Sequence, residues 1–595
     1  MGRDHRKNGS MKSARLKFRI GLFLLAALLF FGGLAKNAAQ PAIGGRIRNF
    51  QTFANDRQGK RTVLRGKDAK NVSRDVAEII GPRLESVNES NQVTLTIEAP
   101  QCFYNNQTQI ATSAENISLK MGGGRVSITG RGWTWAAGES RLVISNAVVA
   151  VIDKQALQTP QATNNIGASL LTGTNKVSDD IHISSTGFEY QADTITFREQ
   201  VIVTDVQGVL NCRTLRAKLI QPGNKIERIE ADEDVRIVQK GTVATGGRAV
   251  YLMSDDEIMM TNSPAWKMED KEGTSDSLVL NRKSNHLHTA GHVYMKLPLS
   301  SVLTNGLDSG AISNRVTNVV EITSQVFDYD QKLAVYRGDV HAKETQGTID
   351  SELLTIYFAP GGSRPERIVA ETNVTMVRGD SRVQGSKATY EIQSDLLRVE
   401  GAPKWQIGDK HGESTFLVLL PRTQEFQAGG GVHMTISKVP GMSLVMDSGS
   451  RSNLASQTRT NELMDVFADR LDHKDNLSIF ENAVRINDPE GEIRCEFLVI
   501  STGASNQVTQ IVADKNVVIT QTNMVTRSDR AFYTLTNGIV ELTGSPKLKA
   551  PDRLLTADVF LLNRSNNTFK TRGKYRIEML RPPESRRTNE IRSKS

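Results

Sequence analysis

Apolar and polar residues alternate with a period of two through most of this chain. Of the alternate residues from Ile258 to Met268, all except Asn262 are apolar, whereas Thr261 between them is polar. Such alternation gives a half-buried β-strand one apolar face and one polar face. Turn-forming runs, SDDE at 254–257, QSD at 393–395 and TNG at 536–538, separate the alternating segments. The pattern predicts an all-β protein with antiparallel strands, including a strand over 461–471, and helical periodicity only in the apolar run 20–35.

Three long segments of the chain repeat one another in register. RIEADEDVRIVQ around Ile229 recurs as RIVAETNVTMVR around Ile368 and as QIVADKNVVITQ around Ile511, at offsets of 139 and 143 residues. A partial fourth copy lies upstream at an offset of 116, with Trp135 at the position of Tyr251. Self-similarity at a fixed spacing indicates an array of like units. The predicted β units are 45–155, 187–298, 325–437 and 463–580, joined by polar linkers at about 155–186, 299–324 and 438–462.

The N-terminus combines a basic tail with an apolar run. Residues 1–19 carry seven Lys or Arg and one Asp, a net charge of +6, and residues 20–35 are uncharged and largely apolar. This arrangement is typical of an export signal whose N-terminus stays in the cytoplasm. Sixteen helical residues would reach about 24 Å, which is short of a bilayer core of about 30 Å. The run is therefore either an uncleaved membrane anchor or a cleaved signal, and both place the rest of the chain outside the cytoplasm.

The formal charge of +9 lies at the two ends of the chain. The C-terminal tail 581–595 has five basic and two acidic residues, so the two tails account for the whole excess. The body between them is formally neutral. A nucleic-acid-binding function therefore loses its main support.

The repeated units have a common pattern beyond their periodicity. In each copy an apolar A-x-Y strand leads through a turn to a strand ending near Gly-Ser-Pro or its equivalent, with hairpins that carry I-x-A-x-x-x-V-x-I or, in the second copy, Met at the last position. This pattern resembles the OstA-like (LptA/LptC) family of lipopolysaccharide-transport proteins over most of residues 45–580. The N-terminal unit, with GRIRNFQTFANDRQGKRTVLRG and TLTIEAPQCFY, resembles the LptC branch, and the three later units resemble tandem LptA or OstA domains.

The resemblance implies a fold and a function. Tandem antiparallel β-jellyroll units would each bend into a V-shaped trough that holds lipid A acyl chains between two sheets. Such units would stack edge to edge and carry lipopolysaccharide from the inner to the outer membrane through the periplasm. The implied partners are lipopolysaccharide, other Lpt-type proteins bound by edge-strand stacking, and the inner-membrane ABC transporter. No cofactor is expected.

The predicted lipid-binding residues are those that alternation places on the inner face of the trough. They are Trp135, Leu142, Ile144, Val235, Ile237, Tyr251, Ile258, Met260, Trp266, Val374, Met376, Tyr390, Leu397, Val399, Trp405, Val517, Ile519, Tyr533, Val540 and Leu542.

No group of residues in the sequence predicts catalysis. His286, His288 and His292 form H-x-H-x₃-H, but copy two lacks them, which favours surface polar residues over a metal site. Cys212 and Cys495 occupy one repeat position, and the Ser at that position in copy two favours a small strand residue over a disulfide. The residues also permit a second interpretation, a structural or adhesive β-repeat protein of the cell envelope without a lipid cavity.

Overall fold

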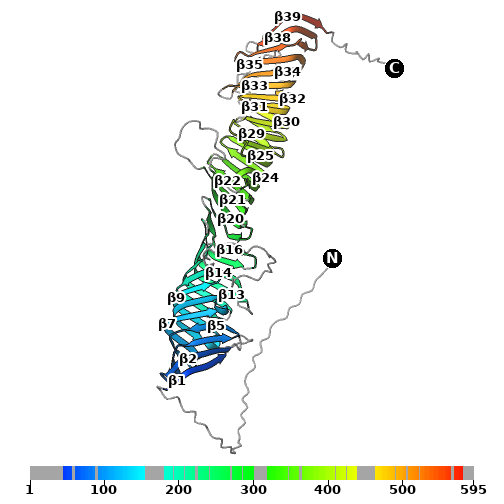
Figure 1. The fold of residues 1–595 in the computed structure, drawn as a ribbon. Helices are drawn as coiled ribbons and strands as arrows, with labels where there is room; N and C mark the ends of the chain where they lie inside the picture. Colours follow the sequence, from blue (N-terminus) through cyan, green and yellow to red (C-terminus); the bar gives the residue numbers. More distant parts are fainter. Residues whose placement is uncertain are drawn as a thin grey trace, which may run out of the picture.

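The computed structural model describes residues 45–580, apart from 154–179, 300–317, 438–462 and several turns of one to five residues. The described chain is an elongated stack of strands, with β1 at one end and β39 at the other (Figure 1). Apart from two single-turn 3-10 helices, Gly122–Gly124 and Ala137–Glu139, the regular elements of the described residues are strands. The predicted all-β antiparallel fold is confirmed.

The N-terminal unit and the first repeat contain strands β1 to β20. Their bounds are β1 Arg46–Asn55, β2 Arg61–Asn71, β3 Val76–Ile80, β4 Arg83–Val87, β5 Val93–Glu98, β6 Gln101–Asn105, β7 Ile110–Met121, β8 Val126–Ala136, β9 Arg141–Ile152, β10 Ile181–Ser185, β11 Gly187–Gln191, β12 Thr194–Thr204, β13 Gly208–Ile220, β14 Lys225–Gln239, β15 Thr242–Leu252, β16 Glu257–Thr261, β17 Ala265–Met268, β18 Lys271–Thr274, β19 Ser277–Asn281 and β20 His286–Leu299.

The second and third repeats contain strands β21 to β39. Their bounds are β21 Asn318–Tyr329, β22 Leu333–Glu344, β23 Gly347–Phe358, β24 Pro365–Arg378, β25 Ser381–Glu391, β26 Leu396–Glu400, β27 Lys404–Ile407, β28 Lys410–Glu413, β29 Phe416–Leu420, β30 Glu425–Ser437, β31 Leu463–Lys474, β32 Leu477–Asp488, β33 Gly491–Thr502, β34 Val508–Gln521, β35 Met524–Thr534, β36 Ile539–Thr543, β37 Lys547–Lys549, β38 Arg553–Asn563 and β39 Thr568–Met579.

Each long strand bends near its middle, which divides the stack into two walls. In several long strands successive residues with positive φ mark the bend, such as Thr372 (65°) and Asn373 (55°) in β24, and the register of the ladder shifts there. We call each layer of the ladder a rung. In some rungs the bend separates two short strands instead of lying within one long strand, as at Gly401 and Ala402 between β26 and β27. Such bulges bend a strand sharply while its pairing continues on both sides.

The two walls can be followed by their aromatic residues. We call the tyrosine wall the strand halves that include Tyr251, Tyr390 and Tyr533, and the tryptophan wall the halves that include Trp266 and Trp405. Thus β26 pairs with one half of β25 in the tyrosine wall, and β27 pairs with the other half in the tryptophan wall. The walls meet along the line of bulges and leave their turn-bearing edges, the rims, on the opposite side.

The antiparallel ladder continues through all three joints between units. At the first joint β9 pairs with β10 and β11, at the second β20 pairs with β21, and at the third β30 pairs with β31. The prediction of loose linkers over 155–186 and 299–324 is therefore wrong for β10 and for the first half of β21. These residues are ordered because they satisfy the open edge of the preceding unit. The unit boundaries themselves stay a prediction.

Ion pairs on the outer face cross the same joints. Glu189 of β11 pairs with Arg141 of β9 and with Arg198 of β12, each at 2.8 Å. Asp328 of β21 pairs with His288 of β20 at 2.7 Å and with Arg337 of β22. Burial raises the pKa of Asp328, but hydrogen bonds from His288 and Arg337 outweigh it and hold the pKa below its ordinary value. These part-buried contacts add to the backbone pairing, although exposed ion pairs contribute little.

A single apolar core runs between the walls from Ala54 to Phe560. The walls touch each other across it. Trp405 of the tryptophan wall packs against Phe426 of the tyrosine wall with ring centroids 5.3 Å apart. The Tyr336 hydroxyl of the tyrosine wall donates to the Met295 sulfur of the tryptophan wall at 3.4 Å. Burial of this apolar surface, at roughly 25 cal/mol per Å², is the main force that holds the walls together.

The predicted N-terminal helix over 20–35 and both basic tails lie outside the described residues. Among the residues that the structure does describe, no helix is long and apolar enough to cross a membrane.

Candidate functional site

All the predicted lipid-binding residues lie on the inner face of the two walls. Most of them are buried, and these are Trp135, Leu142, Ile144, Val235, Met260, Trp266, Val374, Tyr390, Val399, Trp405, Val517, Ile519, Tyr533, Val540 and Leu542. The others are half-buried, and they are Ile237, Tyr251, Ile258, Met376 and Leu397. Contact of these residues with lipid stays a prediction.

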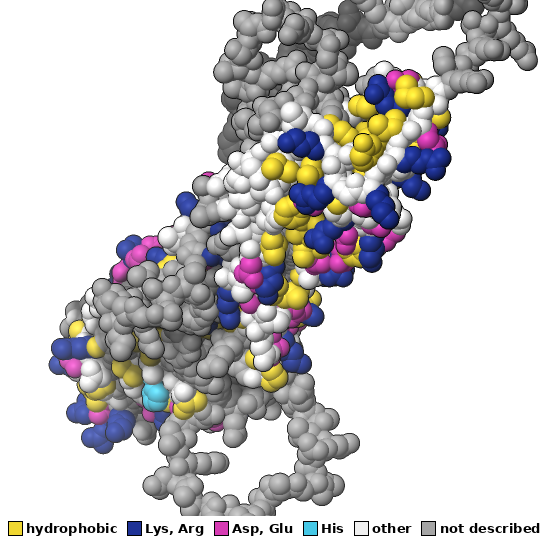
Figure 2. All heavy atoms as spheres, turned by 90° about the horizontal axis from the view of Figure 1, so that it is seen from above, with side chains coloured by type: hydrophobic (Ala, Val, Ile, Leu, Met, Phe, Trp, Pro, Cys, Tyr) yellow, Lys and Arg dark blue, Asp and Glu magenta, His cyan; other side chains and the backbone are white. Residues whose placement is uncertain are grey.

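Both rims carry further half-buried apolar side chains that the sequence analysis did not single out. On the tyrosine wall they are Ile229, Leu280, Tyr329, Phe358, Ile368 and Leu419. On the tryptophan wall they are Leu297, Ile349, Ile407 and Leu548. Each lies at or near the end of a strand. The sequence could have indicated them, because each is an apolar residue close to a turn and in register with the inner face of its strand. Figure 2 shows a stripe of hydrophobic side chains flanked by charged ones on one face of the molecule.

The repeated tyrosines fix turns at the rim of the tyrosine wall. The Tyr251 hydroxyl donates to Asp256 at 2.7 Å, and the Tyr390 hydroxyl donates to Asp395 at 2.8 Å. Asp395 also accepts from the Arg422 amide at 2.9 Å. Burial and the adjacent carboxylate raise the pKa of Tyr251 to about 12, so the phenol stays neutral. The rings therefore lie on the inner face of the tyrosine wall while their hydroxyl groups are satisfied by the turns.

The repeated tryptophans lie over glycines of the neighbouring strand. Trp405 is paired with Gly412, and Trp266 with Gly273. A Cβ atom at Gly412 would lie 2.1 Å from the Trp405 ring, and one at Gly273 would lie 2.3 Å from the Trp266 ring. Each indole therefore requires a glycine opposite it. Sequence reasoning found the tryptophans and missed these partners, although both glycines are visible in the repeat.

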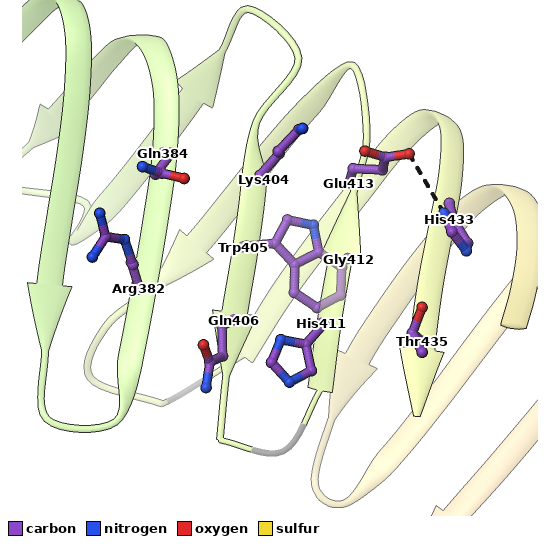
Figure 3. A pocket seen from close by; sticks show the side chains of 10 residues that line it. All are labelled: Arg382, Gln384, Lys404, Trp405, Gln406, His411, Gly412, Glu413, His433 and Thr435. Carbon is purple, nitrogen blue, oxygen red and sulfur yellow. Dashed lines mark hydrogen bonds and ion pairs between the residues drawn. The ribbon is translucent and has the colours of Figure 1, made fainter. Parts of the chain in front are cut away.

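A hollow of about 360 Å³ lies on the outer side of the tryptophan wall. Its lining includes Arg382, Lys404 and His411, and His433 approaches Glu413 at 3.4 Å (Figure 3). His433 also pairs with Asp465 at 3.0 Å. This lining is polar and charged, so it does not suit acyl chains.

The other candidate residues of the sequence do not form a reactive site. His286 and His288 both approach Asp328, at 3.6 and 2.7 Å, whereas His292 contacts Asp276 elsewhere on the surface. Within the described part of the chain, no cluster of three potential metal ligands occurs.

The cysteines are free and buried, which excludes the disulfide alternative in this structure. Burial raises the pKa of each thiol, Cys102, Cys212 and Cys495, to about 12, so the thiols are protonated and unreactive. Cys212, Cys495 and Ser351 occupy the same buried position on the inner face of three repeats, as expected for small strand residues.

The geometry defines a class of protein, an all-β antiparallel stack of strands with one apolar core shared along its length. Within it, residues 320–416 and 467–568 match the family model of the LptA/(LptD N-terminal domain) LPS transport protein, over about a third of the chain. The resemblance to the OstA-like family is confirmed by this match. The assignment of the N-terminal unit to the LptC branch stays a prediction.

Comparison with solved structures finds similar chains. LptH from Pseudomonas aeruginosa, the LptA-homologous periplasmic component of a lipopolysaccharide transport device, is 15% identical. The match covers 24% of this chain and 92% of LptH, with a TM-score of 0.18. No curated protein matches this chain.

Proposed function

We propose that this protein is a non-enzymatic scaffold that holds lipopolysaccharide by its acyl chains and conducts it from the inner to the outer membrane. The observation that carries the proposal is the apolar inner face, which continues without interruption through every joint of the ladder. Transfer of one CH₂ group from water into such a lining is favourable by about 0.8 kcal/mol. Long acyl chains would therefore bind strongly and still slide, because the attraction is non-directional.

The proposed location is the periplasm, with residues 20–35 as the inner-membrane anchor or as a cleaved signal. The two ends of the ladder support partners that add strands. β39 pairs only with β38 among the described strands, and Tyr575, Ile577 and Met579 on it are 65%, 55% and 73% exposed. An unpaired edge with uncovered apolar side chains suits strand addition by another β unit. Other Lpt-type proteins, and the ABC transporter at the membrane end, are the proposed partners.

Photo-crosslinking in living cells tests the trough. A photoreactive residue at Met376 or Leu397, which are half-buried on the inner face, should capture lipopolysaccharide. The same residue at Arg398, which is exposed on the outer face next to Leu397, should not. Equal capture at Leu397 and Arg398 would rule out binding between the walls.

One observation favours the alternative of a structural β-repeat protein of the envelope. The walls contact each other at Trp405 and Phe426, so side chains fill the inner space at this level. Lipid loading then requires the walls to separate by repacking of these rings. Native mass spectrometry of the purified chain distinguishes the two functions, because a structural protein would carry no lipopolysaccharide.

A further inference from the structure

The second repeat places a cation on the inner face of the tryptophan wall. Lys410 begins β28 and lies opposite Ile407 of β27, in the hairpin that also pairs Trp405 with Gly412. Cross-strand partners share a face, as do residues two apart on a strand, so Lys410 faces inward with Trp405. Lys410 is only 8% exposed, which is rare for lysine. Its position next to the hairpin turn places it at the rim.

The other two repeats place a cation at the same position. Lys271 begins β18 and lies opposite Met268 of β17. Arg553 begins β38, and its carbonyl accepts from the Ala550 amide at 2.8 Å across the turn. The repeat offsets of 139 and 143 residues relate the three positions. About eight rungs separate neighbouring cations, which corresponds to roughly 38 Å along the trough.

The tyrosine wall offers polar groups close to Lys410. His473 of β31 lies on the inner face against Phe426, with ring centroids 4.8 Å apart, and its Nδ1 is 2.9 Å from the Ser478 hydroxyl. Burial, and then the charge of Lys410, lower the pKa of His473 to about 4. A neutral imidazole and a hydroxyl group thus accompany the ammonium at this level of an otherwise apolar lining.

We propose that Lys271, Lys410 and Arg553 are subsites for the phosphate groups of an anionic amphiphile whose acyl chains occupy the trough. This inference rests on the proposed function and adds the part of the ligand that the cations recognise. A headgroup must leave the trough at a rim, where these side chains can donate charge-assisted hydrogen bonds to phosphate oxygens. Their repetition gives the headgroup equivalent positions along the path.

Binding measurements on the full chain test the proposal with three probes. The probes are lipid A with its phosphates, dephosphorylated lipid A with the same acyl chains, and inorganic phosphate as a competitor. The triple variant Lys271→Met, Lys410→Met and Arg553→Met keeps apolar side chains at the rim and removes the charges. It should bind phosphorylated lipid A about tenfold more weakly, and should bind the dephosphorylated form within about twofold of the wild type.

The matched control removes three charges from the outer face of neighbouring strands. Lys267→Met, Lys404→Met and Lys547→Met, all at exposed positions, should leave both affinities within about twofold. Equal losses in the two triple variants would overturn the proposal, and so would displacement of dephosphorylated lipid A by millimolar inorganic phosphate, because that form has no phosphate to compete with. If the inner variant does not fold, Arg553→Met, whose side chain is 55% exposed, is compared with Lys547→Met by the same criteria. Failure of the wild type to bind either lipid A would instead contradict the proposed function.

Discussion

Two inner-face tryptophans depend on the absence of a side chain opposite them. In two repeats the hairpin of the tryptophan wall pairs Trp with Gly, and in the third repeat the same pair is Leu548 with Leu555. The Trp–Gly pair and the Leu–Leu pair fill a similar volume. A large indole opposite a glycine takes about the same space as two leucine side chains. The strand pattern alone predicted that these positions face inward, but not how they share volume.

Substitution of Gly412 by Ala should therefore destabilise the second repeat. The added Cβ would lie 2.1 Å from the Trp405 ring, which must then leave its position. Overpacking of this kind costs about 1–3 kcal/mol. Urea unfolding followed by tryptophan fluorescence measures the loss. Gly138→Ala, where a Cβ meets no atom within 4 Å, is the control and should change little.

The third repeat supplies the rescue. Trp405→Leu combined with Gly412→Leu reproduces the pair found at Leu548 and Leu555, and should recover much of the stability lost in Gly412→Ala. Stability below that of Gly412→Ala would show that the ring contact is not the cause.

His473 should make stability depend on pH. Its pKa is lowered to about 4 by burial and then by Lys410, whereas an unfolded histidine titrates near 6.5. Between these values the unfolded chain binds a proton that the folded chain does not, so stability is full above pH 6.5 and falls as the pH approaches 4. After allowance for partial exposure, the expected loss is about 1–2 kcal/mol.

Thermal unfolding at pH 7.5 and pH 5 measures this loss, and His473→Gln should reduce the difference between the two midpoints. His292, whose side chain is 92% exposed, provides the matched control. If His292→Gln and His473→Gln change the pH dependence equally, the buried imidazole is not responsible.

At the scale of the element, the period-two pattern was sufficient to predict the strands and the face to which each residue points. It did not predict the bends. Residues with positive φ are usually glycine, which would have been a signal, yet Lys515 and Asn516 form a bend at φ values of 62° and 53°. Asparagine adopts this conformation more readily than most residues, but lysine does not, so the surrounding pairing imposes it on Lys515 and the local sequence carried only a weak signal.

The joint between β30 and β31 gives a testable register. Thr435 lies opposite Asp465, and the two side chains are hydrogen bonded at 2.8 Å. Cα atoms of directly opposed antiparallel residues lie about 4.5–5.5 Å apart, which suits a disulfide. Thr435→Cys with Asp465→Cys should therefore crosslink under mild oxidation, as detected by mass spectrometry of a tryptic digest. Thr435→Cys with Phe467→Cys, two residues out of register, should crosslink poorly, and the opposite order would contradict the pairing.

At the scale of the whole molecule, the repeats were found from the sequence, and the family resemblance implied that the units stack edge to edge, but the strands that form the joints were not predicted. The joints are rich in polar residues, and local composition therefore predicted linkers at 155–186 and 299–324. Pairing of β9 with β10 and of β20 with β21 depends instead on the open edge of the preceding unit, which local composition does not report. The same edges that would threaten aggregation in a single unit are satisfied within this chain.

A continuous ladder predicts a long, stiff particle. About thirty rungs spaced by about 4.8 Å give a length of roughly 140 Å. Small-angle X-ray scattering of the chain from residue 45 should therefore show a maximum dimension of at least this size, and this dimension should be insensitive to salt because backbone pairing, rather than charge, holds the joints.

Val466→Pro places a residue without an amide hydrogen in β31, between Met434 and Ile486, and should weaken the third joint. A bent or shorter particle in this variant alone would locate the stiffness in strand pairing. Wild-type scattering that already fits freely jointed units would contradict the ladder, and with it an uninterrupted path for an acyl chain.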